Sequence, residues 1–169
     1  MNNLEILKIT GNSIKEVFEF EGLQEGRRYL ERFKELRLDN LSQLTSIWKG
    51  PAQLADFRNV KGLLKLEELW VEDCSDLDEI IQKDGGITFV KIAFPQLKTL
   101  ALQNLAHLVN FYDANSSLEC PFMEHLHVQD CPNFGAHDFH SSKQVYFNDE
   151  RHYNLLKEEV CSHHGFPYM

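Results

Sequence analysis

Short alternations of apolar and polar residues recur along the chain, and they share one form. The form is an apolar residue, two variable residues, Leu, one variable residue, a second apolar residue, two variable residues and then Asn, Leu or Cys. It occurs five times, at residues 4–14, 33–44, 66–77, 97–108 and 123–134. Because side chains alternate between the two faces of a strand, each segment predicts a short strand with one buried face.

The five segments are interpreted as internal repeats. The first matches the complete leucine-rich repeat pattern L-x-x-L-x-L-x-x-N-x-L. Its matching residues are Leu4, Leu7, Ile9, Asn12 and Ile14. The central leucines, spaced by 29, 33, 31 and 26 residues, are Leu7, Leu36, Leu69, Leu100 and Leu126. These periods are longer and less even than the ~20–29 residues usual for this class, and a single α+β domain with coincidental strands is the alternative.

One repeat cannot bury its own apolar face, so stacked repeats share a continuous core. Equivalent strands then lie side by side in a parallel sheet, with the connections over its back. Further apolar residues return the chain across the core: Leu44, Ile47, Trp48, Leu77, Ile80 and Ile81. The predicted fold class is α/β, an irregular leucine-rich repeat solenoid with a curved parallel sheet of about five repeats.

The repeats predict a leucine-rich repeat domain over residues 1–134 and a C-terminal cap or tail over residues 135–169. Within the tail, residues 148–160 predict a capping helix, because three apolar side chains fall on one helical face: Tyr153, Leu156 and Val160. Residues 82–95 contain "DGG", a turn signal that predicts a small hairpin.

The charge of the chain bears on its partners. Its 17 basic and 26 acidic residues give a net charge of -9, which argues against nucleic-acid binding and against docking on an anionic membrane. The N-terminal segment lacks the basic start and apolar run of a signal peptide, and no apolar run is long enough to span a membrane. We therefore expect a cytoplasmic protein whose four cysteines are thiols.

Cys74 and Cys131 occupy the repeat position of Asn12. A catalytic pair, a metal pair, a disulfide and a structural repeat are the alternatives. A small side chain suits an inward turn after the strand, whereas a catalytic cysteine needs an exposed, electropositive site. Acidic residues that raise a thiol pKa stand beside Cys74: Glu72, Asp73, Asp76 and Asp78. We predict that both cysteines are buried, reduced and not bonded to each other.

The strongest candidate for chemistry is a C-x4-H-x-H-x3-C group formed by Cys120, His125, His127 and Cys131. All four are zinc-ligand types. On a strand, however, the two histidines face one way, and Cys131 is expected to point inward, away from both. Nucleotide-binding glycine motifs are absent from the sequence. We expect no enzyme activity, no metal and no cofactor.

Three stretches carry a resemblance to a known family: "LRLDNLSQLTSIWKGP", "LWVEDCSDLDEII" and "FPQLKTLALQNLAHLVNFY" with the following "CPFMEHLHVQDCPNF". They resemble the irregular leucine-rich repeats of plant disease-resistance proteins of the coiled-coil, nucleotide-binding class, over roughly residues 4 to 134. The resemblance implies a module that recognises pathogen molecules or modified host proteins and restrains a nucleotide-binding switch.

This sequence lacks that switch, so a receptor fragment or a truncated relative is expected. The alternative is a free-standing adaptor, such as the substrate-reading part of a ubiquitin-ligase complex. An enzyme that uses the Cys/His group is a third hypothesis.

Residues that flank the buried leucines should point out of the concave sheet. The candidate partner-binding residues on this face are Arg37, Glu68, Trp70, Glu72, His125 and His127. Trp70 is a large aromatic on an otherwise polar surface, and Trp and Arg are common at interface hot spots. The alternative is that the connection at residues 49–65 buries Trp70. We expect a protein partner with a basic or mixed surface, or another domain of the parent receptor.

Overall fold

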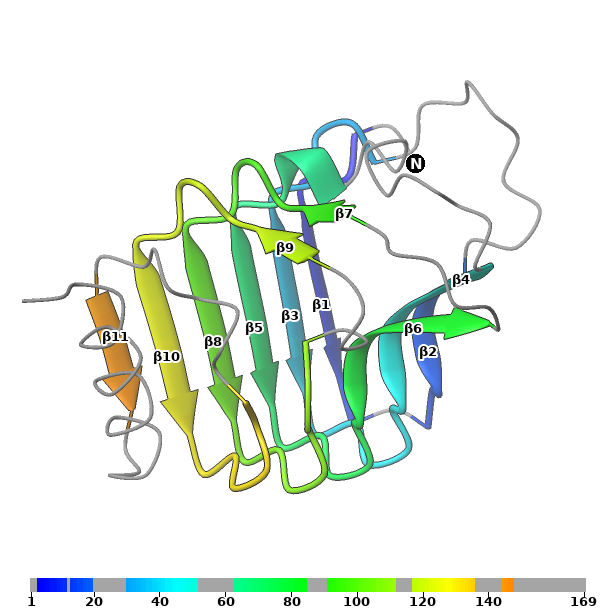
Figure 1. Cartoon of the computed structure of the whole chain (residues 1–169). Coiled ribbons are helices and arrows are strands. Elements are labelled where there is room, and N and C mark those ends of the chain that lie inside the picture. The colour runs from blue at the N-terminus through cyan, green and yellow to red at the C-terminus, as the bar shows by residue number, and fades with distance from the viewer. Residues whose placement is uncertain are drawn as a thin grey trace, which may run out of the picture.

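The computed structural model describes residues 3–11, 13–19, 30–51, 63–84, 91–111, 117–135 and 144–147. Six strands form one parallel sheet and lie side by side in chain order (Figure 1). They are β1 (Ile6–Thr10), β3 (Glu35–Asp39), β5 (Glu68–Glu72), β8 (Thr99–Gln103), β10 (His125–Gln129) and β11 (Gln144–Phe147). The first five contain the repeated alternation, and the sixth comes from the segment assigned to the C-terminal cap or tail.

Two smaller parallel sheets contain the return segments. One consists of β2 (Glu16–Glu19), β4 (Ser46–Pro51) and β6 (Glu79–Asp84). The other pairs β7 (Lys91–Ala93) with β9 (Ser117–Glu119). The prediction of a hairpin at residues 82–95 is wrong. β6 and β7 do not pair with each other, because they belong to different sheets and each has a parallel partner.

The expected α/β class is confirmed in its parallel strands and corrected in its helices. Among the described residues the helical element is a 3-10 turn at Leu63–Lys65, and the rest of the regular structure is strand. Short β-strand and turn segments make the return path because β-branched and aromatic residues such as Ile47 and Trp48 favour extended backbone. The predicted helix at residues 148–160 lies outside the described residues.

The core lies between the large sheet and the β2–β4–β6 sheet. The five central leucines are in register from β1 to β10. Those of β3, β5, β8 and β10 are fully buried, whereas Leu7 is partly buried because β1 is the edge strand. The predicted return residues Ile47, Trp48, Ile80 and Ile81 belong to the same buried cluster. The shared register and core therefore support repeats over coincidental strands.

Each of the first five strands of the large sheet ends in the same backbone turn. The residue after the strand has a positive φ, between 52° and 58°, in Gly11, Asn40, Asp73, Asn104 and Asp130. Gly, Asn and Asp are the residue types that tolerate this left-handed conformation. In four of these residues the N–H donates to a carbonyl oxygen of the next repeat, as from Asn40 to Glu72 at 3.1 Å. This conformation thus directs the chain from the sheet toward the core, and its hydrogen bonds link neighbouring repeats.

Candidate partner-binding face

The outer face of the large sheet is the face opposite the core. Strand register arranges its side chains in three columns. The first column is Ile6, Glu35, Glu68, Thr99 and His125; the second is Lys8, Arg37, Trp70, Ala101 and His127; the third is Thr10, Asp39, Glu72, Gln103 and Gln129. All six predicted partner-binding residues therefore lie on one face, with Arg37 directly beside Trp70.

The Trp70 indole has two polar neighbours that determine its position. The guanidinium carbon of Arg37 lies over the ring, 4.9 Å from the ring centroid. The indole N–H donates to Glu68 Oε2 at 3.0 Å. A cation over the face of Trp and a carboxylate at its N–H both stabilise the ring electrostatically. Trp70 is thus positioned before any partner arrives.

Trp70 is nevertheless accessible, with 37% of its surface exposed. The alternative prediction, that the connection at residues 49–65 buries Trp70, is therefore wrong. The second tryptophan, Trp48, is 1% exposed in the core. An exposed aromatic on a sheet face, oriented by its neighbours, is the kind of side chain that anchors protein interfaces.

The charged residues on β1, β3 and β5 form an ion-pair network. Only some of its members were among the predicted partner-binding residues. Nε of Arg37 donates to Glu35 Oε1, and Arg37 Nη2 lies 3.8 Å from Glu68 Oε2. Lys8 Nζ lies 3.8 Å from the same Glu35 carboxylate. Glu35 was not among the candidate residues. Once the register was assigned, Glu35 stood beside Glu68 in the first column and next to the column that contains Lys8. This position in the sequence indicated Glu35 as a further candidate.

The outer face changes chemistry along the sheet. Asp39 and Glu72, aligned in the third column, form no ion pair within the described part of the chain. Beyond them the outward side chains of β8 are uncharged: Thr99, Ala101 and Gln103. The outward side chains of β10 are His125, His127 and Gln129. The face is therefore charged on β1, β3 and β5, where Lys8, Glu35, Arg37 and Glu68 are paired with one another, and it carries no Asp, Glu, Lys or Arg on β8 and β10.

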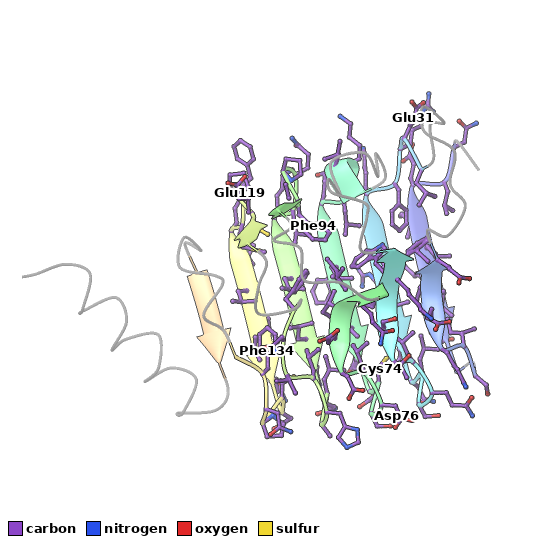
Figure 2. All side chains as sticks on the ribbon, turned by 45° about the vertical axis from the view of Figure 1, so that its right-hand side comes forward. Glu31, Cys74, Asp76, Phe94, Glu119 and Phe134 are labelled. Carbon is purple, nitrogen blue, oxygen red and sulfur yellow. The ribbon has the colours of Figure 1, made fainter. Side chains whose placement is uncertain are left out.

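The two cysteines of the matching phrases lie on the core side. Figure 2 shows Cys74 and Asp76 at the edge where the strands of the large sheet end, and Glu31 and Glu119 at the opposite edge. Cys74 Sγ donates to the Glu72 carbonyl oxygen at 3.2 Å, and Cys131 Sγ donates to that of Gln129 at 3.3 Å. Each thiol therefore satisfies a backbone acceptor in the inward turn, and the equivalent Asn12 lies outside the described residues.

Burial raises the pKa of both thiols to about 11, and the negative charge of Asp73 adds to the shift at Cys74. Cys74, Cys120 and Cys131 are buried and form no disulfide, as predicted for the pair Cys74 and Cys131, and Cys161 lies outside the described residues. Since the thiolate is the reactive form, neither Cys74 nor Cys131 suits a nucleophile. Desolvation is the largest cause of the raised pKa of Cys74; of the four acidic residues predicted to raise it only Asp73 contributes, and Asp39 of the neighbouring strand raises it too.

The Cys/His group is divided by the sheet. His125 and His127 lie on the outer face, whereas Cys120 and Cys131 are buried in the core. Within the described ranges, no three His, Cys, Asp or Glu side chains gather closely enough to hold a metal ion. The alternation of side chains along β10 explains this separation.

A polar pocket opens at the edge where the strands begin. It is lined by Gln96, three carboxylate residues and three basic residues: Glu5, Glu31, Glu67, Arg32, Lys34 and Lys65. Beside it, Lys98 Nζ lies 2.8 Å from Glu67 Oε2, and this hydrogen bond holds the pKa of Glu67 below its usual value. Because its three carboxylates and three basic side chains balance, the pocket favours no sign of ligand charge.

In the described part of the chain, no helix is long and apolar enough to cross a membrane. Comparison with family models gives one match, described as plant disease resistance protein RPS2-like, leucine-rich repeats, over residues 1–64 and 54–137. No curated protein and no solved structure matches the chain.

Proposed function

We propose, since this chain belongs to the RPS2-like leucine-rich repeat family of plant disease resistance proteins, that it is a protein-recognition module of the plant defence response. The outer face of the large sheet is the binding surface, and its repeats form a curved solenoid with this face on the concave side. The observation that carries the proposal is Trp70, exposed on this face and oriented by Arg37 and Glu68.

Preorganisation is the physical reason for choosing this surface. Binding costs free energy when flexible side chains become ordered, at roughly 0.5–1.5 kcal/mol for each. Contacts from Arg37 and Glu68 already restrict Trp70, so less of that cost remains when a partner docks. Trp and Arg are also over-represented among the residues that dominate interface energies. The proposed partner-binding set is Arg37, Glu68, Trp70, Glu72, His125 and His127.

A binding role is favoured over catalysis. The two candidate thiols are buried, with raised pKa values, and the sheet separates the histidines from the cysteines. We also propose a cytoplasmic location, which the absence of a disulfide at Cys74 and Cys131 favours because a reducing compartment keeps thiols reduced. The net charge of -9 favours protein partners over nucleic acid.

The test compares proteins retained from plant leaf extract by the immobilised wild type, Trp70→Ala and Val109→Ser. Val109 is a matched control because it is also an exposed apolar residue, 47% exposed, but lies in a return segment, where its N–H donates to the Asp78 carbonyl oxygen, rather than on the outer face. At least one protein should be retained by wild type and control and depleted about tenfold or more by Trp70→Ala. Equal retention by all three would remove the outer face from the proposal.

A further inference from the structure

The half of the outer face on β1 and β3 is poorly suited to a charged partner. Its charged groups already interact within the chain, through Lys8 with Glu35 and through Arg37 with Glu35 and Glu68. A partner that covered them would remove water from ionised groups without supplying new counter-charges. Desolvation of ion pairs offsets much of their attraction. A partner therefore gains little by pairing with Lys8, Glu35 or Arg37, and Arg37 contributes by orienting Trp70.

The area formed by Trp70 of β5 and the outward residues of β8 and β10 is suited to an apolar partner side chain. Ala101 lies in register between Trp70 and His127, and 5% of its surface is exposed. Thr99 and Gln103 flank it on β8 and carry no charge. Covering neutral and apolar groups costs little desolvation. A partner side chain that packs against the Trp70 ring can therefore extend over Ala101.

The free charge beside this neutral area is negative. Glu72 is exposed, follows Trp70 by two residues on β5, and therefore projects from the same face about 6.6 Å away. Asp39 is its register neighbour on β3. Neither carboxylate has an ion-pair partner in the described segments. A basic group that docks here gains an attraction that no residue in the described ranges supplies.

We infer that the partner is an extended protein segment that docks along β5 and covers Ala101 of β8, with an apolar side chain on Trp70 and a basic residue two positions away that reaches Glu72. The inference rests on the proposed function, because it specifies the partner of the same face. An extended segment matches the spacing, since its alternate side chains also lie about 6.6 Å apart on one face. Charge complementarity with Glu72 and Asp39 selects the basic residue.

The experiment uses a phage library of random dodecapeptides, selected on the immobilised full chain. Enriched peptides are then synthesised, and their affinities are measured by fluorescence anisotropy with wild type and variants. Ala101→Arg blocks the proposed area with a side chain that this column tolerates at Arg37, and Gln103→Arg is a second block on the same strand. Glu72→Gln removes the charge with little change in shape. Lys8→Ala is the matched control, in the same column as Ala101 but outside the area.

Enriched peptides should carry Lys or Arg two positions from an aromatic or aliphatic residue. Glu72→Gln and the two blocking variants should each weaken binding about tenfold or more, and Lys8→Ala should not. Thermal unfolding identifies any variant that fails to fold. If both blocking variants unfold, Glu72→Gln and Trp70→Ala decide the outcome.

Two results would overturn the inference and leave the proposed function intact: enrichment of acidic peptides, or peptides that depend on Arg37 but not on Glu72 or Ala101. A third result would overturn both proposals. In that case no peptide is enriched, or none is affected by any outer-face variant.

Discussion

Arg37 and Trp70 occupy the same position in adjacent strands, β3 and β5, and the guanidinium carbon of Arg37 lies 4.9 Å from the centroid of the Trp70 ring. They are separated by a whole repeat in sequence, so only the stacking of repeats brings them together. The contact covers part of one aromatic residue and orients it on an accessible face. It therefore links the regular register of the sheet to a specific recognition surface.

Trp70→Ala should weaken partner binding by about 2 kcal/mol or more while leaving folding nearly unchanged. The side chain is on the outer face and contributes nothing to the buried cluster. Affinity for a peptide selected on the wild type and the midpoint of urea unfolding are the two measurements. An unfolded variant would instead assign Trp70 to the core, and normal affinity would move the binding site off this face.

Arg37→Ala should make Trp70 more accessible to a neutral quencher such as acrylamide. Trp48 is buried and contributes a nearly constant background, so the change in quenching reports on Trp70. A double-mutant cycle of Arg37→Ala with Trp70→Ala should give a coupling of about 0.5–1 kcal/mol, as expected for an exposed cation–π pair. Unchanged quenching in Arg37→Ala would mean that the guanidinium does not cover the ring in solution.

Leu100→Ala should lower the free energy of unfolding by about 2–5 kcal/mol, because it leaves a cavity under a central strand. Leu100 is fully buried between its register neighbours Leu69 and Leu126. Leu7→Ala is the matched control, since the equivalent leucine of the edge strand is only partly buried. Urea unfolding of both variants tests the order, and an equal or larger loss in Leu7→Ala would contradict the stacked core.

Asn40→Val should destabilise the protein by about 1–2 kcal/mol, because a side chain other than Gly, Asn or Asp is strained in the left-handed region. Asn40 has a φ of 54° and is exposed, so loss of core packing does not contribute. Asn40→Gly keeps the backbone conformation without a Cβ and should change stability little. Thermal unfolding compares the two variants. A similar loss in both would show that the Asn side chain, rather than the backbone angle, is required.

Stability should fall as the pH rises from about 9 to about 11. The pKa of Cys74 is raised from 9.0 to about 11 in the folded chain. In the unfolded chain this thiol loses its proton near pH 9, so the unfolded state binds fewer protons over this window and is favoured as the pH rises. Cys131 has the same shift.

Urea unfolding between pH 8 and pH 11 measures this slope. Cys74→Ala with Cys131→Ala should reduce it, while the titration of lysines and tyrosines continues in both proteins. An identical slope would mean that the thiols are not the source. Titration of the unfolded wild type should also find four free thiols, whereas a Cys74–Cys131 bridge would contradict the position of these residues two strands apart, at about 9–10 Å.

The sequence by itself determined five of the six strands of the large sheet, and β11 was not predicted. A Leu and a second apolar residue two positions later can be buried together only on one face of a strand, so the alternation predicted both the strands and their register. The same reasoning identified Trp70 and its column before any contact was known. Local pattern was sufficient here because the repeated spacing encodes which residues are equivalent.

Only the tertiary structure decided how the return segments pair and which side chains meet across strands. The return segments contain Ile47, Trp48, Ile80 and Ile81, whose apolar runs predict burial but not whether they pair into a second sheet. The hairpin at residues 82–95 failed for the same reason, since a turn signal is local while β6 and β7 pair with strands of other repeats. The link from Glu35 to both Lys8 and Arg37 also depends on side-chain conformations across strands. Strand partners and cross-strand contacts join residues about 30 positions apart, and their free energies arise only when the repeats stack.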